Sequence, residues 1–184
     1  IVHRIDKDTS GLLVVAKTDA AHQALTEQMS VHSIHRVYHA VVYGNLKEDT
    51  GFVEAPIGRD PKDRKKMAVT QQNSKYAYTG WQVLERFGNF TYIACKLKTG
   101  RTHQIRVHMA SIGHPLAGDD LYGGSRERIG RQALHCARQS FRVPVYTPVE
   151  GGIRVECPAN GNNWKTTAAE SPLPQDMKQL FGEK

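Results

Sequence analysis

The sequence is short of cysteine, which limits how the fold can be cross-linked and which metals it can bind. Only three cysteines occur among 184 residues, at Cys95, Cys136 and Cys157. They are odd in number and widely spaced, and no CxxC pair is present. These features argue against both a disulfide framework and a four-thiolate zinc site. We expect reduced thiols, mostly buried.

Long apolar runs are also missing. No stretch approaches the roughly 20 apolar residues that cross a bilayer, and the N-terminus lacks the charged-then-apolar layout of a signal peptide. We therefore expect a soluble, cytoplasmic protein that makes no membrane contact. With 39% hydrophobic residues, the chain is long enough for one domain over residues 1–184. It does not begin with Met, and we expect that residues upstream of Ile1 are absent.

Negative charge is in deficit. The 25 lysines and arginines outnumber the 18 acidic residues, which leaves a formal net charge of +7. Such a balance in a small domain favours a polyanionic partner, and nucleic acid is the leading candidate. A solvated basic surface without any such partner is the alternative, and charge alone does not decide between them.

Apolar patterning predicts a chain that is mainly β, with helices near its two ends and between strands. The short apolar run Leu12–Ala16 is typical of a buried strand. Thr18 or Asp19 is then placed to cap a helix that continues to about Met29. Further strands are expected at Val37–Tyr43, Tyr76–Leu84 and Thr91–Leu97, with weaker candidates at Gln139–Val145 and Gly152–Glu156.

A second helix is predicted from Thr102 onward. The spacing of Ile105, Met109 and Ile112 places them on one helical face, and Gly113 is a suitable C-terminal stop. The other segments are an exposed loop or hairpin tip at Arg59–Lys66, a basic loop at Gly123–Arg131 and a closing helix within Pro172–Phe181.

No metal site is expected. Asp6–Gly11 begins like a calcium loop, but Lys17 stands where the bidentate Glu is required. Four histidines lie in the second half, at His103, His108, His114 and His135. The first two are five residues apart, which puts them on different faces of a helix, and no thiolate pair accompanies them.

Three long strings change the interpretation of residues that mean little singly. They are HRIDKDTSGLLVVAK at the start, HRVYHAVVYG next and LKTGRTHQIRVHMASIGHPLAGDDLYG later. In this order they resemble the main motifs of the RluA family of pseudouridine synthases. The resemblance covers almost the whole chain. Alone, Asp6 would be read as a turn residue, Tyr38 as a half-buried strand aromatic and Arg106 as a helix-surface cation.

The resemblance implies an α+β catalytic domain, with a mixed, largely antiparallel sheet, flanking helices and a central active-site cleft. Part of that domain would lie upstream of Ile1. It also implies that Asp6 is the catalytic carboxylate, Tyr38 the aromatic against the uracil, and Arg106 the partner of Asp6. Arg4 matches the arginine that helps to displace the target base.

Pseudouridine formation is an isomerisation, so it needs no redox cofactor, and we expect none. A carboxylate can assist by adding to the sugar or by removing a ribose proton, and the sequence leaves both roles open for Asp6. Arg106 would keep Asp6 charged in a water-poor pocket. Tyr38 would stack on the extruded ring and accept the C5 proton, directly or through water.

The expected substrate is structured RNA. Resemblance of the central region to the large-subunit ribosomal RNA synthases of the family favours that RNA, with transfer RNA as the other possibility. Expected substrate-binding residues are Arg4, Lys65, Lys66, Arg101 and His103. Further candidates for phosphate contacts are Arg59, Lys62, Arg64, Arg126, Arg128 and Arg131. The rival hypothesis is a non-catalytic RNA-binding or ribosome-assembly module; in either case we expect a monomer.

Overall fold

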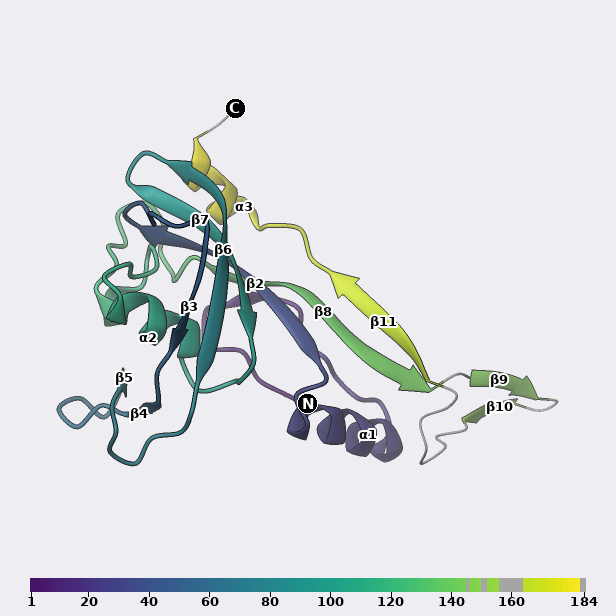
Figure 1. The fold of residues 1–184 in the computed structure, drawn as a ribbon. Helices are drawn as coiled ribbons and strands as arrows, with labels where there is room; N and C mark the ends of the chain where they lie inside the picture. The colour runs from purple at the N-terminus through teal and green to yellow at the C-terminus, as the bar shows by residue number, and fades with distance from the viewer. Residues whose placement is uncertain (145, 150–151, 156–163, 183–184) are drawn as a thin grey trace.

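The computed structural model describes residues 1–144, 146–149, 152–155 and 164–182 (Figure 1). The strands are β1 (Ser10–Gly11), β2 (His35–Tyr43), β3 (Thr50–Glu54), β4 (Ile57–Arg59), β5 (Met67–Val69), β6 (Tyr78–Phe87), β7 (Phe90–Leu97), β8 (Leu134–Pro144), β9 (Tyr146–Val149), β10 (Gly152–Val155) and β11 (Trp164–Glu170). The helices are α1 (Asp19–Ser30), α2 (Gln104–Ser111) and α3 (Gln175–Lys178), with 3-10 turns at Asp120–Tyr122 and Gln179–Phe181.

One large sheet organises the molecule. Its strand order is β1-β8-β2-β7-β6-β3, and β11 also pairs with β8. The β1–β8 pair is parallel, whereas the other pairs within this sheet are antiparallel. The β4–β5 and β9–β10 hairpins extend from the body (Figure 1). This architecture confirms the predicted α+β fold with a mixed, largely antiparallel sheet.

Helices cover opposite faces of the sheet. Ala40 and Val42 of β2 pack in one core cluster with Ile105 and Met109 of α2. Val41, which lies between them, packs in a second cluster around Met177 of α3. Because neighbouring strand residues point to opposite faces, α2 and α3 lie on opposite sides of β2.

Most predicted elements are present. Thr18 caps α1, because its Oγ1 accepts a hydrogen bond from the N–H of Ala21 at 3.2 Å. The strands predicted in the middle of the chain are confirmed as β2, β6 and β7, with ends shifted by up to three residues. The other two candidates correspond to β8, which begins five residues earlier, and to β10; Val145 and Glu156 lie outside the described residues.

The predicted second helix is α2, although it begins at Gln104 rather than Thr102. Gly113 follows it with a left-handed φ of 82° and provides the expected stop. Ile112 is 39% exposed, because it lies just past the last helical residue rather than on the buried face. The basic segment Arg59–Lys66 forms the tip of the β4–β5 hairpin, as predicted.

The last two predictions concern the loop Gly123–Arg131 and the closing helix within Pro172–Phe181. Gly123–Arg131 is an irregular loop, as expected. The closing helix is confirmed only in part, since Pro172–Pro174 are not helical and the helix begins at Gln175.

The predicted strand at Leu12–Ala16 is wrong. Only Ser10–Gly11, just before it, pairs as a strand. Beyond it, backbone and side-chain partners alternate: the N–H of Leu12 still donates to the Cys136 carbonyl, but the Leu12 carbonyl accepts from Gln139, and the N–H of Val14 donates to His3 Nε2 at 3.2 Å. Leu13 and Val15 are exposed. The apolar run therefore lacks the continuous ladder and two-sided burial that its composition suggested.

Candidate active site

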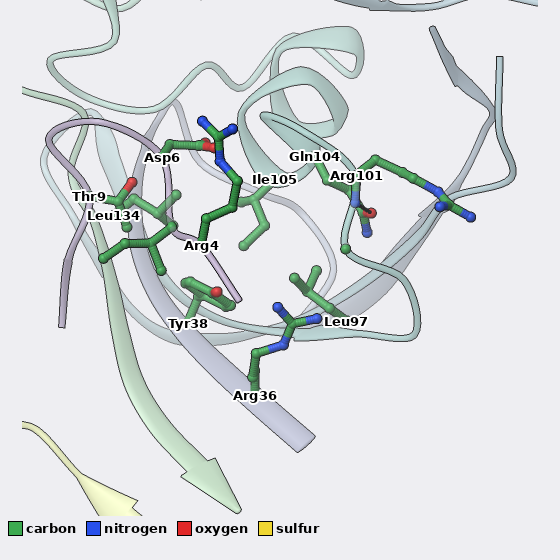
Figure 2. Close-up of a pocket in the computed structure, with 12 residues that line it drawn as sticks. Arg4, Asp6, Thr9, Arg36, Tyr38, Leu97, Arg101, Gln104, Ile105 and Leu134 are labelled. Atoms are coloured by element: carbon green, nitrogen blue, oxygen red, sulfur yellow. Dashed lines mark hydrogen bonds between the residues drawn. The ribbon is translucent and has the colours of Figure 1, made fainter. Parts of the chain in front are cut away.

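A cavity of about 60 Å³ opens where the N-terminal segment crosses β2, β8 and the start of α2 (Figure 2). Its polar lining consists mainly of three arginines, Arg4, Arg36 and Arg101, and one carboxylate, Asp6. The apolar part of the lining is formed by Ile5, Tyr38, Leu97, Ile105 and Leu134. We call this hollow the Asp6 cavity. It combines a carboxylate with a positively charged, partly apolar wall, and an apolar lining with a few placed polar groups is typical of small-molecule sites.

A tight loop fixes Asp6. Its carbonyl accepts a hydrogen bond from the N–H of Thr9 at 3.1 Å, and Gln132 holds the loop by donating to the Lys7 carbonyl and to Thr9 Oγ1. The chain then pairs with β8 at Gly11, whose φ is 106°. A Cβ there would lie 2.3 Å from the carbonyl oxygen of Cys136. The glycine is therefore required for the close approach that places Asp6.

Arg106 contacts two carboxylates. Its Nε and Nη2 donate to Asp119 Oδ2 and Oδ1 at 2.7 and 2.8 Å, and its Nη1 lies 3.8 Å from Asp6 Oδ2. Arg106 and Asp119 are both buried. Burial alone would lower the pKa of Arg106, but the hydrogen bonds and charge of Asp119 outweigh that effect and raise it. Arg106 is therefore a permanently charged group behind Asp6.

Tyr122 connects the ion cluster formed by Asp6, Arg106 and Asp119 to the β4–β5 hairpin. Its ring lies 5.0 Å from the guanidinium carbon of Arg106. Its hydroxyl accepts from the N–H of Met67 at 2.9 Å and lies 2.7 Å from Nδ1 of His103. Desolvation, followed by the nearby Arg106 charge, lowers the pKa of His103. His103 and Tyr122 share a hydrogen bond, and Tyr122 thereby attaches the basic hairpin to the back of the site.

Tyr38 forms part of the cavity floor. It is buried, and β2 has a β-bulge between Val37 and Tyr38 where it pairs with β8. Bulges of this kind change the direction of a side chain and are common beside active sites. Desolvation, with a smaller contribution from the Cys136 thiol, raises the pKa of the Tyr38 phenol. Tyr38 is therefore a neutral hydroxyl at physiological pH.

The structure brings most of the predicted site residues together, but not all. Arg4, Asp6, Tyr38 and Arg101 line the Asp6 cavity. Figure 2 shows Arg4 extending from the N-terminal segment toward the side on which Asp6 lies. Arg106 contacts Asp6 from behind, and His103 lies behind the cavity against Tyr122. Lys65 and Lys66 lie away from the Asp6 cavity, and Lys66 lines a surface hollow beside α2.

Two charged residues of the site, Asp119 and Arg36, were not predicted. Asp119 lies in the third string, thirteen residues after Arg106 and past the glycine that ends α2. Nothing in the sequence distinguishes it from Asp120. Arg36 lies just before the predicted strand Val37–Tyr43, and the β-bulge between Val37 and Tyr38 interrupts the alternation that would relate it to Tyr38, so the strand pattern alone did not place it at the cavity.

The four histidines of the second half lie in separate hydrogen-bond networks. His103 contacts Tyr122, and His108 lies between Thr79 and the Ala55 carbonyl. His114 contacts the Tyr43 carbonyl, and His135 lies between Ser10 and the Ser171 carbonyl. In the described part of the chain, no helix has the length and apolar character needed to cross a bilayer.

The chain is thus an α+β domain whose cavity holds one carboxylate among three arginines, and sequence comparison gives its family. Residues 1–111 match the RNA pseudouridylate synthase family. The chain belongs to this family. The resemblance inferred from the three strings is thereby confirmed.

Named relatives support the same assignment. The chain is 49% identical to the uncharacterized RNA pseudouridine synthase YlyB of Bacillus subtilis, over 98% of this chain and 54% of the relative. It is 47% identical to ribosomal large subunit pseudouridine synthase D of Nitrosomonas europaea, over 98% of this chain and 50% of the relative. The chain thus spans about half the length of the curated relatives it matches.

Solved structures agree with the fold. Human RNA pseudouridylate synthase domain containing 1 is 26% identical and superposes with a TM-score of 0.71, covering 99% of this chain and 80% of that one. Human RNA pseudouridylate synthase domain containing 4 also has a TM-score of 0.71, at 20% identity, over 96% of this chain and 72% of that one.

Proposed function

We propose that this chain carries the active site of an RNA pseudouridine synthase and that Asp6 is its catalytic carboxylate. The observation that supports the proposal most is the placement of Asp6. Its side chain is 19% exposed in a cavity walled by three arginines and Tyr38, with the guanidinium of Arg106 at 3.8 Å. Family membership makes uridine isomerisation the chemistry that this placement serves.

The reaction breaks the bond between uracil N1 and ribose C1′ and forms a bond from C5 to the same carbon. The C5 hydrogen leaves as a proton and N1 takes up a proton, so atoms and electrons balance without a redox cofactor. Asp6 acts either by adding to C1′ or by removing a ribose proton as the base departs. Arg106 supports both roles, because it places a fixed positive charge beside the carboxylate.

Tyr38 is proposed to contact the uracil and to handle the C5 proton. Its raised pKa keeps it a neutral phenol, so it relays the proton through its hydroxyl rather than acting as a phenolate base. A stacked base cannot reach the cavity, so the nucleotide must be extruded at a cost of a few kcal/mol. Arg4, exposed at the cavity, is proposed to occupy the vacated place in the RNA.

We propose structured RNA as the substrate, and large-subunit ribosomal RNA in particular. The support is the name of relatives such as the Nitrosomonas europaea protein and the net charge of +7. Pseudouridine mapping of large-subunit ribosomal RNA from cells with and without the gene tests this directly. The proposal predicts that one or more pseudouridines disappear and return with the wild-type gene. Unchanged maps of both ribosomal and transfer RNA would favour the non-catalytic RNA-binding module.

A further inference from the structure

A second hollow lies beside the Asp6 cavity, at the end of the sheet where β2 begins and β7 ends. Its volume is about 340 Å³, and its cationic lining consists of Arg36, Lys96 and Arg138, beside His35. We call it the strand-end groove. Arg36 and Leu97 line both hollows, so the groove opens next to the cavity. Figure 2 shows these two side chains at the rim of the Asp6 cavity.

The groove is suited to a polyanion. None of the residues that line it is Asp or Glu. Arg138 pairs with Glu170 at 3.4 Å, but both side chains are more than half exposed, so the pair is weak. Lys96 also lines an adjoining hollow with Lys98, whose Nζ lies 4.0 Å from the ring centre of Tyr78, and that hollow too has no carboxylate in its lining. Cations interspersed with aromatic rings are typical of surfaces that bind single-stranded RNA.

Arg36 has an unsatisfied hydrogen-bond donor beside the groove. Its Nε is buried without a hydrogen-bond partner, and no ion pair to it occurs among the described residues. Gly100 leaves room for its guanidinium, since a Cβ there would lie 2.9 Å from Nη2. Buried donors in folded proteins are generally satisfied. A phosphate is the ligand that suits a forked, permanently charged donor.

The Asp6 cavity is too small to hold a whole nucleotide, whereas the strand-end groove beside it is larger. Binding pockets for small molecules usually have volumes of about 300–1,000 Å³, so the Asp6 cavity of about 60 Å³ leaves the phosphates of a bound nucleotide outside. We propose that the strand-end groove binds the RNA backbone next to the target uridine, with Arg36 on a phosphate flanking that nucleotide and Lys96 and Arg138 on the phosphates that follow. This inference rests on the proposed function.

The test combines a protein change with a change in the RNA backbone. Wild-type and Arg36→Gln full-length proteins are titrated against an RNA stem-loop that contains the mapped target uridine. Each phosphate near the uridine is replaced singly by a neutral methylphosphonate, with a 2′-O-methyl ribose protecting the linkage. Fluorescence anisotropy gives the affinities, and an unmodified stem-loop with the same 2′-O-methyl groups is the RNA control.

The proposal predicts that Arg36→Gln weakens binding about tenfold and lowers the salt slope by about 0.7, the value for one contact to a single strand. At one flanking position the methylphosphonate weakens the wild type similarly but does not weaken the variant further. Arg36→Lys should retain the salt slope. Lys47→Gln, beyond the other end of β2, which lies roughly 23 Å from Arg36 at the rise of a β-strand, should change neither quantity.

If the protein change and the methylphosphonate weaken binding independently at every flanking position, so that their fold-changes multiply, Arg36 contacts none of these phosphates and the proposed RNA contact of the groove is wrong. This conclusion requires that Arg36→Gln melts near the wild-type temperature. Replacing Lys96 by Gln gives a second measurement, and the same cycle should then point to a different phosphate. Release of tritium from [5-³H]uridine in a large-subunit ribosomal RNA transcript separates the two proposals. If the wild type releases tritium but the protein and RNA changes act independently, the proposed function stands and the proposed RNA contact of the groove is wrong. If the wild type releases no tritium, both proposals are wrong.

Discussion

Arg106 and Asp119 form a buried, bidentate ion pair, with contacts of 2.7 and 2.8 Å, while Asp6 lies 3.8 Å from the remaining guanidinium nitrogen. The shorter, fully hydrogen-bonded pair sets the position of Arg106, and Asp6 uses the charge that is thereby held in place. Asp119 is therefore expected to act on the site through Arg106 rather than by touching RNA.

Asp119→Asn should lower both stability and turnover. The change removes one charge from a buried pair, and breaking such a pair costs about 3 kcal/mol or more. We expect kcat for pseudouridine formation to fall more than tenfold while KM changes little, because Arg106 loses its fixed orientation. Urea unfolding and tritium release measure the two effects. Asp120→Asn is the matched control, since Asp120 is exposed and its ion pair in the described part of the chain is with exposed Arg126. Equal effects of the two variants would contradict the assignment.

Tyr38→Phe should retain RNA binding but lose product formation by orders of magnitude. The ring that contacts the uracil remains, whereas the hydroxyl that handles the C5 proton is removed. Tyr43→Phe, on the same strand, removes a hydroxyl that donates to the Ser125 carbonyl outside the Asp6 cavity. It should leave turnover unchanged. Full activity of Tyr38→Phe would show that its hydroxyl takes no part in proton transfer.

RNA affinity should fall steeply with salt, because phosphate contacts release counterions. Reversing Lys65 and Lys66 to Glu should reduce the slope of log affinity against log salt by roughly 1 to 2, if each contacts one phosphate. Nitrocellulose filter binding between about 50 and 200 mM salt measures the slope. Reversing Lys47 and Lys178, which are exposed on other segments, controls for net charge. An affinity independent of salt would count against RNA as the partner.

Stability should decrease as pH falls below about 6.5, the ordinary pKa of histidine. Desolvation lowers the pKa of five histidines: His3, His39, His103, His108 and His135. Below 6.5 the unfolded chain therefore binds more protons than the folded one, so the free energy of unfolding rises with pH in this window. The urea midpoint should be lower at pH 5.5 than at pH 7.5.

His108 offers the sharpest check of this pH effect. It is fully buried, and both ring nitrogens have partners, in Thr79 and the Ala55 carbonyl. His108→Gln should be less stable than the wild type at pH 7.5, yet should show a smaller loss between pH 7.5 and pH 5.5. His32→Gln, at an exposed position, should leave the pH dependence as it was. A midpoint that rises on acidification would contradict the pKa directions.

The sequence predicted helix ends and helix faces well, because these depend on residues close together in the chain. The Thr18 cap, the apolar spacing of Ile105 and Met109, and the left-handed Gly113 all depend on a few neighbouring residues, and these predictions were confirmed. The strand at Leu12–Ala16 was wrong, because whether an extended apolar segment joins a sheet depends on partners far along the chain. Here those partners include the side chains of Gln139 and His3.

The site was predictable only as far as the family motifs reach. Asp6, Tyr38 and Arg101 were chosen from those motifs, and they line one cavity. Asp119 was not chosen, because its burial against Arg106 follows from the turn after α2, and Asp120 beside it is exposed. Arg36 becomes visible as a site residue only when the ends of β2 and β7 are seen to meet beside the cavity.

The central claim is that Asp6 is the catalytic carboxylate, and release of tritium from uracil C5 tests it most directly, because that hydrogen must leave whichever path the sugar follows. In the full-length protein, Asp6→Asn keeps the shape of the side chain but removes both nucleophile and base. Asp8→Asn is the control, since Asp8 is exposed with a φ of 66°, a conformation that Asn also tolerates. We predict no release above background for Asp6→Asn, near-normal release for Asp8→Asn, and RNA affinity close to wild type for both. Release by Asp6→Asn at a rate near that of the wild type would contradict the claim.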